Sequence, residues 1–191
     1  VLSLDIFDTC LRRISGPPET VFQMLEREMA LAGAPLPGFS GHRVRMENQL
    51  RRAIQERGQR EDVCLEEIYD GLGESLAWTE DTRVRWMDRE CALEAALVRP
   101  LGEVRERARE AVARGIPLVY VSEMYLSSGF LQRILRAAGF PVEDAAVHVS
   151  GEAGLSKGSG RLYQQVRAAF PGKRILHIGD NPETDVSVPR G

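Results

Sequence analysis

Apolar residues recur at helical spacing through the first half of the chain. The first amphipathic stretch begins at a pair of prolines, which suit the first turn of a helix, and repeats apolar side chains at Val21, Leu25 and Met29. Clusters of Pro and Gly separate it from three further helical stretches, at about 40–57, 62–78 and 80–98. This pattern predicts a small helical bundle.

The pattern changes at Pro100, after which apolar runs of strand length alternate with amphipathic helices. The expected strands cover residues 116–122, 145–150 and 174–180, and residues 1–5 supply one more. The helices between them carry apolar stripes at about 104–112, 131–138 and 162–170. Continuous apolar strands that alternate with helices are typical of an α/β fold with a parallel sheet covered on both faces.

The helical stretch therefore interrupts an α/β domain after its first strand. We predict a Rossmann-like core made of residues 1–11 and 99–191, with a helical cap domain inserted at residues 12–98. Because only "VSVPRG" follows Asp185, the C-terminal edge strand of such a sheet is expected to be missing. The domain is then either truncated or continued in a longer polypeptide, and the start at Val1, inside a strand, agrees with this.

Composition and charge exclude several classes of function. The 191 residues are 43% hydrophobic and 28% charged, as in ordinary globular proteins, and the net charge of -3 does not indicate nucleic acid or an anionic membrane as a partner. No apolar run has the length of a membrane span, and the N-terminus lacks the pattern of a signal peptide. Three widely spaced cysteines fit neither a disulfide framework nor a metal knuckle, so a cytoplasmic location is expected.

Polar residues end three of the expected strands. Asp5 follows "VLSL", Ser122 follows "PLVYV" and Asp180 follows "ILHIG". Ligands bind beyond the carboxyl ends of the strands in open parallel sheets, so these side chains are expected to meet. After Asp180, an Asn-Pro pair begins a helix whose first turn contains Asp185. Taken one at a time, the same residues could simply end strands and cap a helix.

Three carboxylates in one crevice favour a cation. Asp5, Asp180 and Asp185 would repel one another unless a cation neutralised them, and oxygen ligands of this kind suit Mg²⁺. Lys157, in "GLSKGSG", can supply a positive charge to a phosphate or to a carboxylate. Ser122 can donate a hydrogen bond to a phosphoryl oxygen. Taken alone, Lys157 is also compatible with a solvated loop and Ser122 with an ordinary strand end.

Together, these stretches resemble the four motifs of the haloacid dehalogenase (HAD) superfamily, in the family's order. The matching segments are "LDIFDT", "VYVSEMYL", "LSKGSGRLY" and "HIGDNPETD". The resemblance covers residues 1–11 and about 100–188, and the helical insertion lies where the family places a cap. It implies a magnesium-dependent phosphatase that hydrolyses a small phosphate monoester, with Asp5 as the nucleophile that forms an aspartyl-phosphate.

The resemblance also implies a role for each matching residue. Mg²⁺ would be held by Asp5, the backbone carbonyl of Phe7, Asp180 and Asp185. The catalytic residues would be Asp5, Asp8, Ser122 and Lys157. The phosphoryl group would be bound by Thr9, Ser122, Glu123 and Lys157. The only partner expected is a small phosphorylated substrate.

One position departs from the family pattern and leaves alternatives open. Family phosphatases carry a general acid two residues after the nucleophile, where this chain has Phe7, and Asp8 stands where the family usually has glycine. Either Asp8 replaces the acid, or the leaving group needs no proton, or catalysis is weak. One alternative is a module that binds a phosphorylated ligand or partner with little or no turnover. The other is a 2-haloacid dehalogenase, in which Asp5 would displace halide without a metal.

The remaining polar residues are expected to have structural roles. We interpret the three histidines, His42, His148 and His177, as cap-surface or sheet-core residues rather than as ligands. The charged stretch at residues 42–60 is interpreted as a solvated helix face, with contact to an anionic substrate as the alternative.

Overall fold

The chain divides into two compact units, which are described separately. The structure is a computed structural model that describes residues 1–58 and 60–190, so Gln59, in the charged stretch, and Gly191 lie outside the described residues. The sheet unit comprises Val1–Arg12 and Arg99–Gly191, and the helical unit comprises Arg13–Val98. The chain passes between them through two short strands that pair with each other, β2 (Leu11–Arg13) and β3 (Val98–Pro100).

The sheet unit contains a four-stranded parallel sheet. Its strands are β1 (Leu2–Leu4), β4 (Leu118–Ser122), β5 (Ala146–Val149) and β6 (Leu176–Ile178), in the order β5-β4-β1-β6. The N-terminal strand is central, since Leu4 is paired with Tyr120 of β4 on one side and with Ile178 of β6 on the other. The carboxyl ends of β4, β1 and β6 therefore meet at one edge of the sheet.

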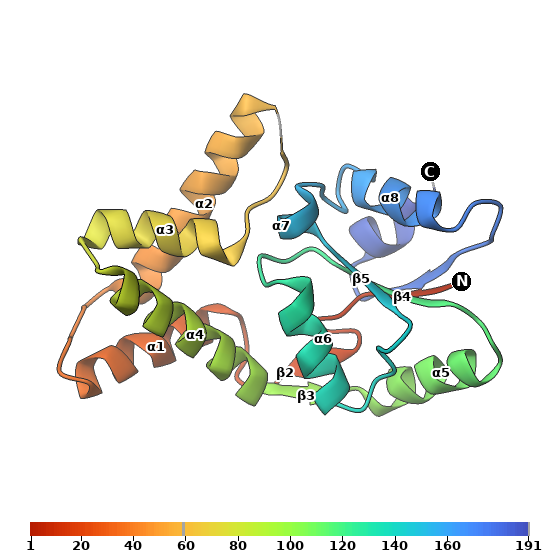
Figure 1. The fold of residues 1–191 in the computed structure, drawn as a ribbon, viewed down its shortest axis with the longest axis horizontal. Helices are drawn as coiled ribbons and strands as arrows, with labels where there is room; N and C mark the ends of the chain where they lie inside the picture. The colour runs from red at the N-terminus through yellow and green to blue at the C-terminus, as the bar shows by residue number, and fades with distance from the viewer. Residues whose placement is uncertain (59, 191) are drawn as a thin grey trace. The chain divides into compact units, whose positions relative to one another are not determined.

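Helices cover both faces of this sheet (Figure 1). On one side lie α5 (Gly102–Ala113) and α6 (Ser128–Ala137), and on the other lies α8 (Arg161–Ala169), preceded by the short α7 (Ser150–Ala153). Val119 and Val121 of β4 pack against α8. Tyr120, between them, points to the opposite face, where its ring meets Phe140 edge-on. The predicted α/β fold with a parallel, helix-covered sheet is confirmed.

β6 forms one edge of the sheet. Within the described residues no strand pairs with its outer side. Leu176 is 64% exposed there, and it lines a cavity of about 490 Å³ together with Tyr163, His177 and Asp185 among others. After β6 the chain forms a π-helical segment, Pro182–Ser187, and a 3-10 turn, Val188–Arg190.

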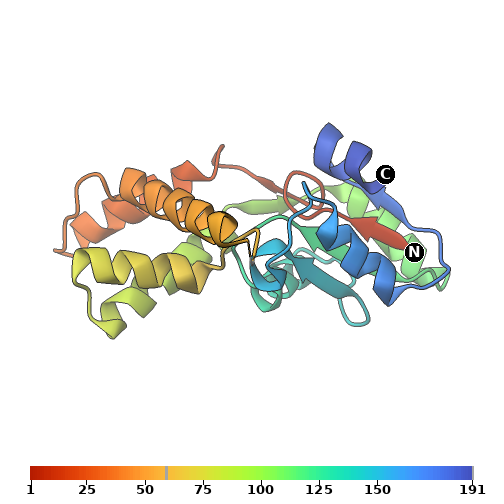
Figure 2. The same ribbon diagram turned by 90° about the horizontal axis from the view of Figure 1, so that it is seen from above.

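The helical unit consists of the predicted bundle. Its helices are α1 (Glu19–Leu31), α2 (Phe39–Arg57), α3 (Leu65–Leu76) and α4 (Glu80–Ala96). Both α1 and α3 pack against α2 and α4 (Figure 2). The apolar stripe predicted on α1 is buried, at Val21, Leu25 and Met29. In the described parts of the chain, no helix has both the length and the apolar composition that crossing a membrane requires.

One arginine of the charged stretch is not solvated. The Arg43 guanidinium is fully buried and donates hydrogen bonds to both carboxylate oxygens of Glu90, at 2.9 and 3.0 Å. The Tyr69 hydroxyl donates to the same carboxylate at 2.8 Å. The interpretation of residues 42–60 as a solvated face is therefore wrong at Arg43, because a buried partner from α4 neutralises this charge.

Candidate active site

Asp5 directly follows β1 and is buried at the carboxyl end of the sheet. Its backbone N–H donates to the carbonyl of Ile178 at 2.9 Å, which extends the pairing of β1 with β6 to this residue. Only 6% of Asp5 is exposed. Burial raises the pKa of the Asp5 carboxyl, and the charge and hydrogen bond of Lys157 offset only part of this rise. An anionic Asp5 therefore depends on positive charge close by.

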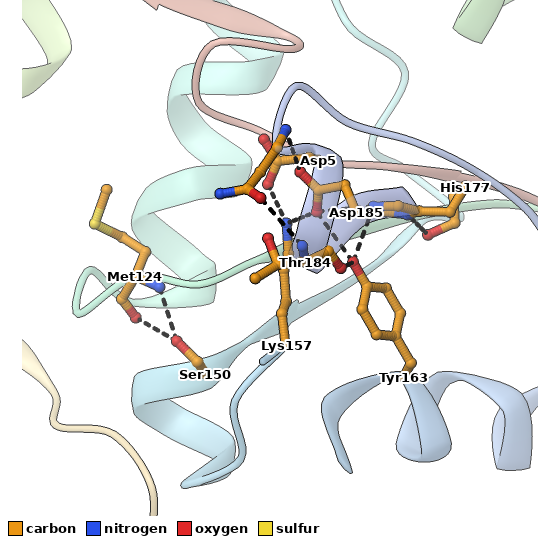
Figure 3. A network of polar contacts seen from close by, with 10 residues as sticks. Asp5, Met124, Ser150, Lys157, Tyr163, His177, Thr184 and Asp185 are labelled. Atoms are coloured by element: carbon orange, nitrogen blue, oxygen red, sulfur yellow. Dashed lines mark hydrogen bonds and ion pairs between the residues drawn. The ribbon is translucent and has the colours of Figure 1, made fainter. Parts of the chain in front are cut away.

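Lys157 supplies that charge at the centre of the site (Figure 3). Its ammonium donates hydrogen bonds to Asp5 Oδ1 and, at 2.8 Å, to Asp185 Oδ1. Burial alone would lower the pKa of Lys157, but the charges of Asp5 and Asp185 outweigh it and raise this pKa above its ordinary value. Lys157 is thus a buried, charged residue that links carboxylates from the two ends of the chain.

The turn after β6 directs Asp185 back towards the strands. Asn181 caps this turn, since its Oδ1 accepts hydrogen bonds from the N–H groups of Glu183 and Thr184 at 3.0 and 3.1 Å. The backbone N–H of Asn181 donates to Asp185 Oδ2 at 3.1 Å. A Cβ atom at Gly179 would lie 2.3 Å from Asp185 Cγ, so this position has no room for a side chain.

Three carboxylates gather at this edge of the sheet. One oxygen each from Asp5, Asp180 and Asp185 lies within 4.8 Å of the others. Asp5 and Asp185 are buried, whereas Asp180 is exposed. Oxygen donors at this spacing, from residues that would otherwise repel one another, fit a hard divalent cation such as Mg²⁺. The donor set therefore suits the ion that the motif resemblance implies.

Several other expected site residues lie at the end of β4 or in the chain that follows β1 and β4. Ser122 is buried at the end of β4, and Glu123 after it is exposed. Thr9 is 5% exposed, and its hydroxyl has no hydrogen-bond partner within the described residues. A buried hydroxyl without a partner is costly, and a ligand that accepts its hydrogen bond would remove this cost.

The two residues at the departure from the family pattern are placed differently. Phe7 is buried and forms an isolated bridge with Leu11. Asp8 is exposed and has a φ of +58°, in the left-handed region that favours glycine, asparagine and aspartate. Its N–H donates to the carbonyl of Leu11 at 2.7 Å. Asp8 therefore fits the turn that a glycine would otherwise make.

Three residues that contact or support Asp185 were not expected from the sequence. The Tyr163 hydroxyl and His177 Nε2 lie 3.0 and 3.2 Å from Asp185 Oδ1, and Ser3 Oγ lies 2.7 Å from His177 Nδ1. His177 lies in the sheet, as interpreted, but it also contacts a site carboxylate. Burial acts to raise the pKa of Asp185, but hydrogen bonds from His177 and the charge of Lys157 outweigh it and lower this pKa. For Ser3 and His177, the signal in the sequence was a polar residue inside an otherwise apolar strand.

Comparison with known proteins supports the fold. No protein-family model matches the sequence, and no curated protein matches it. Among solved structures, a 2-haloacid dehalogenase from Pseudomonas syringae pv. tomato matches with a TM-score of 0.64 at 16% identity, over 99% of this chain and 81% of that chain. The putative HAD-hydrolase YfnB from Bacillus subtilis, bound to magnesium, matches with a TM-score of 0.58 at 17% identity, over 99% and 83%.

A HAD family enzyme from Bacteroides thetaiotaomicron is also similar, with a TM-score of 0.60 at 12% identity, over 99% of this chain and 87% of that chain. At these identities the likeness concerns the fold. The chain therefore has the HAD fold, with a Rossmann-like sheet and a helical insertion after the first strand, as the motif resemblance implies.

Proposed function

We propose that this chain is a HAD-superfamily hydrolase that cleaves a small phosphate monoester with the help of Mg²⁺, through an aspartyl-phosphate on Asp5. The observation that carries this proposal is the cluster of Asp5, Asp180 and Asp185, in which Asp5 and Asp185 pair with the buried ammonium of Lys157. Halide displacement by a carboxylate requires no cation, so a site that only displaced halide would not need the exposed Asp180 beside two buried carboxylates. The cluster therefore favours phosphoryl transfer.

The metal ligands would be Asp5, Asp180 and Asp185, together with the backbone carbonyl of Phe7. When bound, the ion would supply positive charge to the oxygens of the phosphoryl group. The Asp5 carboxylate would attack phosphorus, the bond from phosphorus to the leaving oxygen would break, and water would then hydrolyse the acyl phosphate and restore Asp5.

The other polar residues of the site would bind and orient the phosphoryl group. Lys157 would neutralise its charge and hold Asp5 in the anionic form. Ser122 and the unpartnered hydroxyl of Thr9 would donate hydrogen bonds to its oxygens, and Glu123 would contact the substrate from the end of β4. Phe7 has no proton to donate, so Asp8 is the nearby carboxyl that would protonate the leaving group.

A 2-haloacid dehalogenase is the second candidate. Several similar solved structures are dehalogenases, and the resemblance to these enzymes includes a non-acidic residue at the position of Phe7. In this reaction the Asp5 carboxylate would displace halide from an alkyl carbon, and water would hydrolyse the resulting ester. The proposed phosphatase requires Mg²⁺ for turnover, whereas the dehalogenase does not.

An assay with p-nitrophenyl phosphate and with 2-chloropropionate, each with Mg²⁺ or with EDTA, separates these candidates. We expect release of p-nitrophenol that EDTA abolishes and that Asp5→Asn loses. Chloride release that EDTA leaves undiminished would instead support the dehalogenase. If the protein binds phosphate but turns over neither substrate, it is a binding module. A screen of sugar phosphates, nucleotides and small phosphate esters then defines the substrate class.

Two variants in the same assay test the role of Asp8. If Asp8 is the acid, Asp8→Asn and Asp8→Gly both lower turnover, by less than Asp5→Asn and up to roughly 10²–10⁴-fold. If Asp8 serves only the turn, Asp8→Gly keeps full activity because glycine adopts the left-handed backbone without strain. Asp144→Asn, at an exposed acid of the same unit, is the control and should leave turnover unchanged.

A further inference from the structure

A buried polar pair bridges two strands behind the site. Ser3 of β1 and His177 of β6 are paired in the parallel ladder, and Ser3 Oγ lies 2.7 Å from His177 Nδ1. Ser3 is 1% exposed, and the His177 side chain is 4% exposed. Two apolar side chains would fill these positions without the cost of removing polar groups from water. The pair therefore calls for an explanation beyond packing of the sheet.

His177 reaches Asp185 with its second ring nitrogen. Nε2 lies 3.2 Å from Asp185 Oδ1 (Figure 3). Because this carboxylate oxygen only accepts hydrogen bonds, Nε2 carries the hydrogen that faces it. Nδ1 is then free to accept the hydrogen of the Ser3 hydroxyl, and this bond fixes the tautomer and the orientation of the ring. A chain of two hydrogen bonds thus runs from Ser3 through His177 to Asp185.

The position of Asp185 matters because both of its oxygens are used. Oδ1 is within hydrogen-bond distance of Lys157 Nζ, of the Tyr163 hydroxyl and of His177 Nε2, at 2.8, 3.0 and 3.2 Å. Oδ2 accepts from the backbone N–H of Asn181 at 3.1 Å. The Tyr163 hydroxyl has one hydrogen and also lies 2.9 Å from the Thr184 carbonyl, so its bond to Asp185 is shared. The Nε2 hydrogen of His177 likewise faces two acceptors, because the Tyr163 hydroxyl oxygen lies 3.1 Å from Nε2.

We propose that Ser3 and His177 are positioning residues, which hold the Asp185 carboxylate in the orientation that pairs it with Lys157 and turns it to a cation shared with Asp5 and Asp180. The inference rests on the proposed function, since it concerns the metal and the lysine of the same site. Partners behind a metal ligand orient it, and their loss typically weakens metal affinity by about 10–100-fold.

Four variants of the full chain test this role. His177→Phe keeps a planar ring and removes both nitrogens, whereas His177→Gln keeps an N–H group near the position of Nε2. Ser3→Ala leaves the ring and removes its hydrogen-bond partner. The matched control is His148→Phe, because His148 is half-buried in β5 of the same sheet and, among the described residues, makes no hydrogen bond to the three carboxylates.

The first readout is the dissociation constant for Mg²⁺, measured by calorimetry on each variant. We expect His177→Phe to weaken Mg²⁺ binding by roughly 10–100-fold, Ser3→Ala to weaken it less, and His177→Gln to recover part of the loss. His148→Phe should bind Mg²⁺ like the unchanged protein. With p-nitrophenyl phosphate at limiting Mg²⁺, kcat should fall in His177→Phe while KM changes little. A purely structural histidine would alter thermal stability without this pattern.

The second readout needs no metal. Crystal structures of the unchanged protein and of His177→Phe, grown with EDTA, should show that the Asp185 carboxylate has rotated away from Lys157 in the variant. The proposal is overturned if folded His177→Phe binds Mg²⁺ as tightly as the unchanged protein, or if its Asp185 keeps the same orientation. Should the variant not fold, Ser3→Ala decides by the same measurements. If the unchanged protein binds no Mg²⁺ and cleaves no ester, the proposed function fails, and the crystal structures alone decide the positioning role.

Discussion

Removal of the buried ammonium at position 157 tests the electrostatics of the site directly. Lys157→Met keeps the length of the side chain and removes its charge, which leaves Asp5 and Asp185 without their shared donor. The three side chains are 3%, 8% and 2% exposed, so water cannot take the place of the lysine without rearrangement. Two buried carboxylates would then face each other, and the folded state should lose stability.

The expected loss follows from the burial of this ion pair. Removal of one partner from a buried salt bridge costs about 3–5 kcal/mol, because it leaves an uncompensated buried charge. For a domain of this size, 1 kcal/mol corresponds to about 2–4 °C in Tm, so the midpoint should fall by roughly 6–20 °C. Lys173→Met is the matched control at the other lysine of the chain, which is exposed, and it should change stability by less than about 0.5 kcal/mol.

The loss should depend on pH, and two carboxyl groups set its sign. The pKa of Asp5 is raised by burial and rises further without Lys157. In the variant, the folded state therefore takes up a proton on Asp5 at a higher pH than the unfolded chain does. The loss of stability caused by Lys157→Met shrinks as pH falls. In the unchanged protein, burial acts to raise the pKa of Asp185, but hydrogen bonds from His177 and the charge of Lys157 lower it below its ordinary value. The ionised Asp185 stabilises the folded state at pH values above the pKa of about 4 that it has in the unfolded chain, and this stabilisation is lost as pH falls below that pKa.

Both effects make the difference in unfolding free energy between Lys157→Met and the unchanged protein larger at neutral pH than in acid. Urea unfolding at about pH 8 and about pH 3, with EDTA present, measures this difference above and below the unfolded carboxyl value of about 4. Added Mg²⁺ should restore part of the stability of Lys157→Met, since a cation at the carboxylates replaces the lost charge. Equal stability of the variant and the unchanged protein at the higher pH, or an equal loss at both pH values, would refute the reasoning.

Two further predictions concern other parts of the structure. Gly179→Ala places a Cβ atom 2.3 Å from Asp185 Cγ, so Asp185 must move, and both Mg²⁺ affinity and turnover should fall by at least the roughly 10-fold expected for a displaced ligand. Unchanged Mg²⁺ affinity in this variant would contradict the placement of Asp185. In the helical unit, Arg43→Met leaves the Glu90 carboxylate buried without its guanidinium partner and should destabilise the protein by about 3–5 kcal/mol. Urea unfolding of Arg43→Met beside Arg52→Met, which changes an exposed arginine of the same helix, checks this, and similar losses in both would count against a special role for Arg43.

The sequence predicted the features that follow from local pattern. The alternation of apolar strands with helices gives the parallel sheet, and the parallel sheet in turn brings Asp5 and Asp180 to the same edge. The cap of the last turn was also readable, because Asn181 followed by proline is a common helix start. These features depend on residues a few positions apart or on the direction of the strands. Both can be inferred from the sequence.

The partners of buried polar groups were not predictable in the same way. Arg43 and Glu90 are 47 positions apart, and Ser3 and His177 are 174 positions apart. Periodicity indicates which face of an element is buried, but it does not indicate which charged or polar group meets it there. The left-handed backbone of Asp8 was also missed, because its φ depends on how the loop returns to Leu11.

The central place of β1 has a consequence for the biogenesis of the protein. Ser3 is separated by 174 positions from His177, its partner in β6, so the ribosome delivers one side of this pairing long before the other. At typical rates of about 5–20 residues per second, the first strand waits on the order of ten to thirty seconds before the sheet can close around it. During that interval its apolar side chains are exposed to other chains and to chaperones. Premature termination anywhere before β6 would leave β1 without a neighbour on that side.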